Sequence, residues 1–324
     1  MMAAQGTGRV SGGARDHTLP RRRSVSPRLI QLESDAPAEH VFRELVAAYV
    51  SATPRIVVHQ EGGIRSSTRD VVSSFRERFG ARARLDDERG DLVLYGLDPQ
   101  NPPRLSQLTF RLGECVLDLL RDAGFGNASS AREEDWDERD NLVDALAWEV
   151  QRRVTRAWRD PRESGLRERV NPIRWLEASR ALERIGDHAV LIAIHGARWI
   201  ETEPAEAERR LLTEFHHQAS DYVDGALVLL IDPRVGSANA ALDLGVALRE
   251  TGRALVDRLI AARSVNPPPP LAVVSLGWAL HSLDRIVAYG MDLAEIALDS
   301  AQPARPSLHG PPSEDDTGGN ESHE

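Results

Sequence analysis

The sequence predicts a mostly α protein with two tandem three-helix bundles, preceded by a small α/β sandwich domain. Three observations support this prediction. After residue 104, long segments repeat apolar residues at steps of three and four, the period of helices that pack lengthwise. Between residues 28 and 99, short strand-like and helix-like patterns alternate. A proline-marked stretch, 98–103, separates the two regions.

The composition of the 324 residues is that of an ordinary soluble protein, with 41% hydrophobic and 28% charged residues. The net charge is −10, although the first 28 residues hold six arginines against one aspartate. An acidic body argues against a nucleic-acid-binding surface on the bundles. No apolar run is expected to span a membrane and no signal peptide is visible, so we expect a cytoplasmic protein. The single cysteine, Cys115, is expected to be a buried, inert thiol.

Residues 1–27 lack periodicity and are expected to form a disordered basic leader. The next region, 28–99, is expected to form the α/β domain, with helices on one face of its sheet. Its strands are predicted at 29–32, 55–59, 83–87 and 91–97, and its helices at 38–50 and 68–79. The region contains no glycine-rich phosphate loop, no cysteine or histidine cluster and no nucleophile elbow. It therefore carries no sign of catalysis.

The helical region divides into two groups of three predicted helices. The first bundle, 104–200, contains helices at 105–123, 133–158 and 171–200, and the second bundle, 204–299, contains helices at 205–230, 237–263 and 271–298. In the helix 133–158, four apolar residues recur at four-residue spacing: Leu142, Leu146, Val150 and Val154. Residues 300–324 are expected to form a disordered acidic tail.

The helix at 171–200 has the clearest seam, with apolar or small residues at alternating steps of three and four. They are Trp175, Ala178, Leu182, Ile185, Ala189, Ile192, Gly196 and Trp199. The same seam returns 101 residues later in the helix 271–298. Identical pairs include Ala178 and Ala279, Leu182 and Leu283, Arg184 and Arg285, Ile185 and Ile286, and Ala193 and Ala294. The repeat predicts that the two bundles are homologous.

Within this helix, Arg180-Ala-Leu-Glu-Arg-Ile-Gly-Asp-His-Ala189 closely resembles the signature of the PhoU family of phosphate-uptake regulators. The resemblance implies two PhoU-like three-helix bundles and a non-enzymatic regulator without catalytic residues. It also implies a phosphate transporter ATPase or a phosphate-signalling protein as partner, with a homodimer as a further option. Archaeal PhoU-like chains place an α/β domain before the bundles. In the leader, residues 9–13 and 19–21 faintly resemble the start of the AbrB-like domain that precedes some of them.

The resemblance also implies a metal site between two carboxylate pairs. Asp140 and Asp144 match the pair on the second helix, and Glu183 and Asp187, four residues apart on one helix face, match the pair on the third. Four carboxylates form a hard site that suits iron, zinc, manganese or magnesium. The second bundle keeps half of each pair, with Asp243 and Asp284 present and Ala247 and Ala288 in the other two positions. We therefore expect metal only in the first bundle.

Two other function classes remain open. One is a bundle metalloenzyme of the di-metal carboxylate type, suggested by Glu214 and His217 at Glu-x-x-His spacing. The sequence lacks a second copy of that motif, so we expect a surface histidine pair, His216 and His217. The other class is a DNA-binding regulator that uses the basic leader. The remaining bundle histidines, His188, His195 and His281, are expected to be structural or surface residues.

Overall fold

The computed structural model describes residues 26–86, 88–98, 102–125, 133–159, 172–263 and 269–301. Residues 1–25 of the expected leader, with its AbrB-like fragment, and the tail from residue 302 lie outside the described residues. The described chain is mostly helical, with one small sheet near its N-terminal end. The fold class predicted from the sequence is confirmed.

The α/β domain alternates strands and helices before it ends in a hairpin. Its elements are β1 (Arg28–Leu32), α1 (Ala38–Val50), β2 (Ile56–Gln60), α2 (Ser66–Phe79), β3 (Arg82–Asp86) and β4 (Asp91–Tyr95). The strand order is β1-β2-β4-β3, in which β1 and β2 are parallel and the other pairs are antiparallel. β4 ends two residues before the predicted Leu97, because Gly96 has a φ of 68° and takes the chain out of the extended conformation.

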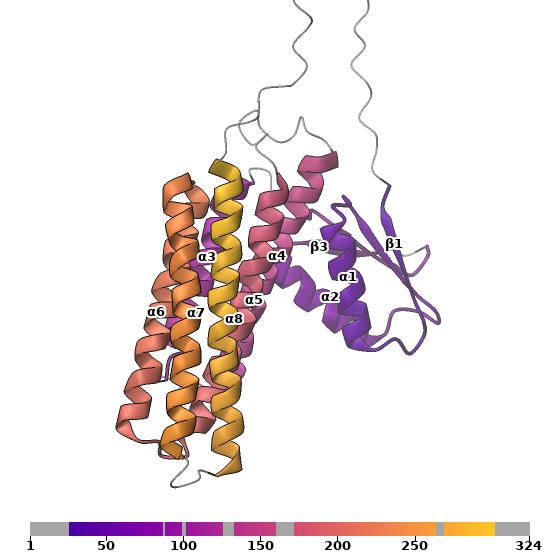
Figure 1. Ribbon diagram of the computed structural model, residues 1–324. Helices are drawn as coiled ribbons and strands as arrows, with labels where there is room; N and C mark the ends of the chain where they lie inside the picture. Colours follow the sequence, from indigo (N-terminus) through magenta and orange to yellow (C-terminus); the bar gives the residue numbers. More distant parts are fainter. Residues whose placement is uncertain are drawn as a thin grey trace, which may run out of the picture.

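Both helices of this domain cover the same face of the sheet. Alternate residues of β1 and β2, with Leu94 of β4, are buried there, and these side chains form one cluster with apolar residues of α1 and α2. The cluster includes Ile30, Ile56, Val58 and Leu94 of the sheet and Val41, Leu45, Val72 and Phe75 of the helices. In Figure 1 the two helices lie between the sheet and the long helices. The helices, rather than the sheet, therefore face the rest of the protein.

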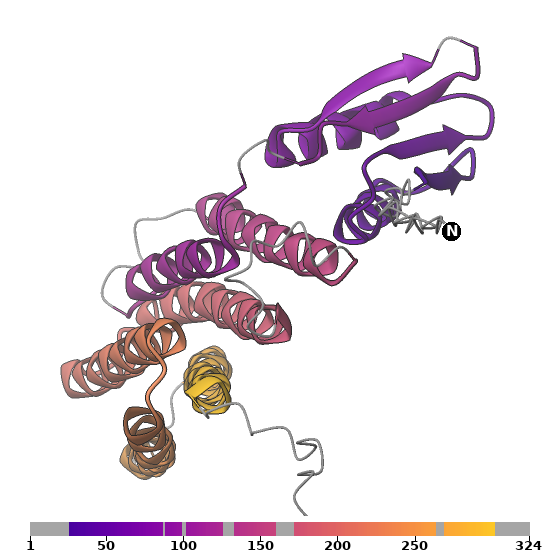
Figure 2. The same cartoon turned by 90° about the horizontal axis from the view of Figure 1, so that it is seen from above.

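Six long helices follow in two groups of three. They are α3 (Leu105–Asp122), α4 (Glu133–Arg159), α5 (Pro172–Ile200), α6 (Glu206–Ile231), α7 (Val235–Arg263) and α8 (Pro270–Ala301). Each of α3, α4 and α5 contacts the other two, and so does each of α6, α7 and α8. The groups meet where α5 packs on α8 and α3 on α6, and Figure 2 shows the α/β domain beyond α4, on the side away from the second group. Buried residues of both groups belong to one hydrophobic core.

The seam predicted for α5 is confirmed, because all eight of its residues are buried. The four-residue series predicted for α4 is wrong at its first member: the Leu142 side chain is 50% exposed, while its neighbour Val143 is 1% exposed. The buried line of α4 instead runs through Trp136, Val143, Ala147, Val150 and Val154, and half-buried Asp140 lies on the same line, so the steps alternate between four and three. A strict step of four drifts by about 40° per step around a helix of 3.6 residues per turn, so Leu142, three steps from Val154, falls outside the core while Leu146, Val150 and Val154 stay in it.

The helix α8 corrects a second expectation. By length and composition alone it is long and apolar enough to cross a membrane, although the sequence was expected to hold no such segment. In the fold, 50% of its apolar window is buried, and the helix packs against α5, α6 and α7. Core helices of soluble bundles meet the same two criteria, because a helix buried on several sides is apolar on most of its surface.

Candidate metal site

The α4 and α5 helices approach each other closely at Gly186. A Cβ atom added there would lie 3.0 Å from Cγ1 of Val143 on α4, so a side chain at this position would push the helices apart. The glycine within the family-like run 180–189 therefore has a packing role. The close approach brings two acidic pairs together, Asp140 and Asp144 on α4 and Glu183 and Asp187 on α5.

Three of the four predicted ligands converge on one point. Asp144, Glu183 and Asp187 each offer a carboxylate oxygen, and these oxygens lie within 4.8 Å of one another. Asp140 lies outside this group, one helical turn before Asp144. Its Oδ1 atom is nevertheless buried and has no hydrogen-bond partner in the described structure. The carboxylates of α4 and α5 thus face the same side of the bundle, as a shared site requires.

The electrostatics of this cluster disfavour four negative charges. Burial, followed by the charges of Asp187 and Asp137, raises the pKa of Asp140 to about 6. Burial also raises the pKa of Asp144 to about 7, with further contributions from the three neighbouring carboxylates.

The two acids of α5 are perturbed in the same direction. Burial raises the pKa of Glu183, and the charge of Asp187 adds to this effect. Burial likewise raises the pKa of Asp187, against the opposing charge of Arg184. Without a cation, the four carboxylates therefore repel one another, and each binds a proton more readily than an isolated carboxyl group.

The donor set fits a hard metal ion. Oxygen ligands bind such ions at about 2.0–2.6 Å, so two ligands on opposite sides of one ion lie roughly 4–5 Å apart. The 4.8 Å spread of the three oxygens lies within that range. The Oδ1 atom of Asp140, one helical turn away, has no hydrogen-bond partner in the described structure and is a candidate for a further ligand atom. The metal site stays a prediction, and the geometry meets its requirements.

The second bundle uses its remaining acid differently. Asp284, the counterpart of Glu183, accepts hydrogen bonds from Arg249 of α7, at 2.8 Å from Nε and 3.0 Å from Nη2. This pairing lowers the pKa of Asp284, the opposite of the shift at Glu183. Asp243 is exposed on α7. An ion pair across two helices therefore occupies the place that corresponds to the acidic cluster.

The histidines of α6 differ from the expected surface pair. His217 is exposed and, with Glu214, lines a surface pocket of about 670 Å³. The side chain of His216 is instead 1% exposed, and its Nε2–H donates to the carbonyl oxygen of Leu120 at 2.9 Å. The prediction of a surface residue is wrong for His216, because α6 packs against the end of α3 as well as against its own bundle. Sequence spacing does not reveal such a contact between bundles.

The other predicted residues have structural surroundings. His188 Nδ1 lies 3.2 Å from the hydroxyl of Ser282, and the ring of His195 stacks on Trp278 at a centroid distance of 5.7 Å. Both contacts join α5 to α8. The thiol of Cys115 is half-buried, and burial raises its pKa. A raised pKa disfavours the reactive thiolate, as expected for an inert thiol.

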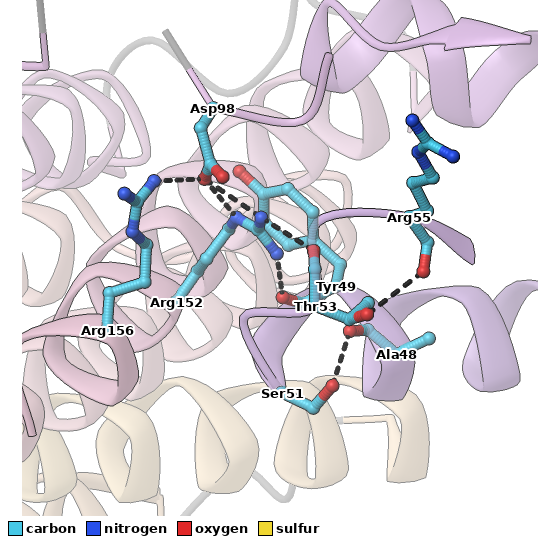
Figure 3. Close-up of polar contacts among 8 residues, drawn as sticks. All are labelled: Ala48, Tyr49, Ser51, Thr53, Arg55, Asp98, Arg152 and Arg156. Carbon is cyan, nitrogen blue, oxygen red and sulfur yellow. Dashed lines mark hydrogen bonds and ion pairs between the residues drawn. The ribbon is translucent and has the colours of Figure 1, made fainter. Parts of the chain in front are cut away.

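Sequence reasoning missed a polar anchor between the α/β domain and α4. The side chain of Arg152 is 1% exposed and donates to the carboxylate of Asp98 and to the carbonyl oxygens of Tyr49 and Thr53. Figure 3 shows it reaching from α4 to the end of α1, while Arg156 contacts the same carboxylate of Asp98. One turn earlier on α4, Trp148 packs into the α/β core. The only sequence signal of this anchor was the pair Trp148 and Arg152, an aromatic residue and an arginine four residues apart and away from the buried seam of α4.

The fold and this cluster define a helical-bundle protein with a candidate cation site between two long helices. Residues 111–194 match the PhoU domain, which confirms the resemblance seen in this part of the sequence. A crystal structure of PhoU from Pseudomonas aeruginosa is similar at 19% identity and a TM-score of 0.46, over 60% of this chain and 91% of that one. No curated protein matches the sequence.

Proposed function

We propose that this protein is a PhoU-type regulator of phosphate uptake or phosphate signalling. In this proposal it acts as a non-enzymatic adaptor that binds a metal ion and a partner protein. The observation that carries the proposal is the position of the family match: residues 111–194 include all of α4, most of α5 and all four candidate ligands. The part of the chain that matches the family model is thus the part that contains the cluster of four half-buried carboxylates.

The cluster itself suggests how the adaptor would respond to its surroundings. Asp140, Asp144, Glu183 and Asp187 would hold an iron, zinc, manganese or magnesium ion, which would offset their mutual repulsion. A bound ion with open coordination positions can accept a phosphate oxygen. The acidic side chains around it can receive a basic group of a partner. The site would therefore link ion or phosphate status to partner binding.

The partner in this proposal is a phosphate transporter ATPase or a phosphate-signalling protein, met in the cytoplasm. Two long bundles present extended helix surfaces to such a partner. Self-association into a homodimer is compatible with this role. The net charge of −10 makes a nucleic acid an unsuitable partner for the bundles.

The test removes the charge of two candidate ligands, one from each helix. Cells carrying Asp144→Asn and Asp187→Asn together should lose normal control of phosphate uptake, while the protein stays folded and abundant. The substitutions keep the size of both side chains and leave the buried seam intact, so stability should change by less than the ~2–5 kcal/mol of a core truncation. Uptake of labelled phosphate in replete and starved cells gives the readout.

The matched control uses Glu114 and Asp118 on α3, an exposed pair with the same four-residue spacing in the same bundle. Glu114→Gln with Asp118→Asn removes two charges outside the cluster and should leave uptake control unchanged. Normal control in the Asp144 and Asp187 double variant would contradict the proposal. So would a purified protein that hydrolyses a phosphate ester with turnover.

A further inference from the structure

The packing of α5 on α8 brings equivalent residues of the two repeats together. Arg184 and His188 lie one turn apart on α5, and 101 residues later Arg285 and Tyr289 occupy the same positions on α8. The rings of His188 and Tyr289 lie next to each other, at a centroid distance of 5.9 Å. The place where the two bundles meet is thus built from matching positions of both repeats.

Two guanidinium groups converge on the side chain of Tyr289. The guanidinium of Arg285 lies 4.5 Å from the centre of the Tyr289 ring, and that of Arg184 lies 5.7 Å from it. Burial raises the pKa of the Tyr289 hydroxyl, but the hydrogen bonds and charges of the two arginines outweigh this effect, and the pKa is lowered. The arginine from each bundle therefore lies beside the same buried ring and acts on the same hydroxyl group.

Neither arginine has a counter-ion in contact with it. In the part of the chain that the structure describes, neither Arg184 nor Arg285 forms an ion pair with a carboxylate. The neighbouring acids act on the arginines only from a greater distance, namely Glu183 and Asp187 on Arg184, and Asp292 on both. Two positive charges beside one neutral hydroxyl repel each other, and an anion held between them would remove that repulsion.

We propose that Arg184, Arg285 and Tyr289 form a binding site for a tetrahedral oxyanion, with inorganic phosphate as its ligand. A guanidinium group donates paired N–H groups to such an anion, and a tyrosine hydroxyl donates one more hydrogen bond. Arg184 is exposed and Arg285 is half-buried, so an ion can reach them from solvent. The choice of phosphate rests on the proposed function, whereas the oxyanion site itself does not.

The position of this site gives the anion a structural effect. Arg184 belongs to the first bundle, and Arg285 and Tyr289 belong to the second. The complete site therefore exists only while α5 and α8 are packed together. An anion that binds the packed state alone stabilises it by mass action. Phosphate would thus strengthen the packing of one bundle on the other.

The first test measures binding of inorganic phosphate to the full-length, chelator-treated protein by calorimetry, with sodium chloride holding the ionic strength constant. The wild type should show saturable binding with a Kd of about 1 mM. Arg184→Gln and Arg285→Gln should each weaken binding roughly tenfold, because each removes a charged hydrogen-bond donor. Arg184→Lys keeps the charge but loses the paired donors, and its affinity should lie between those of the wild type and Arg184→Gln.

The matched control is Arg198→Gln. Arg198 is an exposed arginine of the same helix α5, roughly 21 Å along the axis from Arg184. It removes the same charge away from the site and should leave the affinity for phosphate unchanged. Sodium acetate supplies the carboxylate of an acidic side chain and should not displace phosphate at equal concentration. Displacement by acetate would overturn phosphate as the ligand and assign the site to a partner's carboxylate.

The second test measures thermal unfolding with and without phosphate. Phosphate should raise the melting temperature of the wild type and of Arg198→Gln, but not that of the double variant Arg184→Gln with Arg285→Gln. Without phosphate and at low salt, the double variant should melt no lower than the wild type, because the repulsion between the two arginines is gone. A lower melting temperature would overturn the view that these charges lack a counter-ion.

The results separate this inference from the proposed function. A wild type without saturable phosphate binding, or binding that both glutamine variants leave unchanged, would overturn the oxyanion site. These measurements use chelator-treated protein, so they do not depend on the acidic cluster. Normal uptake control in the Asp144 and Asp187 double variant would instead contradict the proposed function, while phosphate binding lost with Arg184 and Arg285 would still establish the site.

Discussion

Replacing Arg152 by alanine should detach the α/β domain from α4 and lower the free energy of unfolding by about 3–5 kcal/mol. The side chain is 1% exposed, so its partners lie where water cannot replace it easily. Two of them are the carbonyl oxygens of Tyr49 and Thr53 at the end of α1. A helix end concentrates partial negative charge, which a buried cation stabilises.

The magnitude follows from the individual contacts. A hydrogen bond to a charged group contributes about 1.5–3 kcal/mol, so the two carbonyl contacts together contribute roughly 3–6 kcal/mol. The stacking of Arg152 over the Tyr49 ring, at 4.7 Å, adds to this. Part of this stabilisation is offset, because the guanidinium of Arg152 is hydrated in the unfolded chain and loses that hydration when the protein folds. The loss of the contact between Arg152 and Asp98 costs less free energy, because Arg156 remains 2.8 Å from the Asp98 carboxylate.

Urea unfolding gives the free energy, and hydrogen exchange shows where protection is lost. The loss should appear in α1 and spare α6 to α8. Arg159→Ala, an exposed arginine at the end of the same helix, is the matched control and should be nearly neutral. Arg152→Lys should recover only part of the stability, because an ammonium group cannot reproduce the forked guanidinium contacts. A loss below ~1 kcal/mol for Arg152→Ala, or exchange changes confined to the bundles, would refute this reasoning.

Three further variants test packing and pH dependence. Gly113→Ala should lower the free energy of unfolding by about 1–3 kcal/mol, because its Cβ would lie 2.5 Å from Cδ2 of Leu227. Gly277→Ala meets nothing within 4 Å and should be neutral or stabilising in thermal unfolding. Burial lowers the pKa of His216 from 6.5 to about 4 in the folded protein. As the pH drops from 6.5 to about 4, His216 therefore binds a proton in the unfolded chain before it does so in the folded one, and the free energy of unfolding falls. His216→Gln keeps a donor for Leu120 and should flatten this fall in urea titrations; an unchanged pH profile would contradict the assignment.

The elements themselves could be predicted because their signals are local. In α5, apolar residues recur at steps of three and four over eight positions, and each of the eight is buried. The pair Glu183 and Asp187 follows from the same geometry, since residues four apart share a helix face. The resemblance then added the α4 pair, and the structure brings Asp144 to the α5 acids while Asp140 lies one turn away.

The errors occurred where an element has more than one neighbour. Leu142 was assigned to the apolar series of its helix, whereas the buried residue is its neighbour Val143, because a step of four and the alternating step of the real seam coincide over only a few residues. His216 looked like a surface residue until the end of α3 was placed against it. In both cases the periodicity correctly predicted a helix. It did not predict which face of the helix packs against other parts of the protein.

The sequence by itself determined the order of the elements, the two groups of three helices, the seam of α5 and the acidic pair on it. These properties depend on the fixed repeat of a helix and on residues close together in the chain. Only the tertiary structure decided that Arg152 is buried against the end of α1. Those contacts join residues 99 and 103 positions apart in the chain. They form where the α/β domain packs against the first bundle. A charged side chain buried at such an interface leaves no periodic signal in the sequence, because its burial depends on hydrogen-bond partners that the other domain supplies.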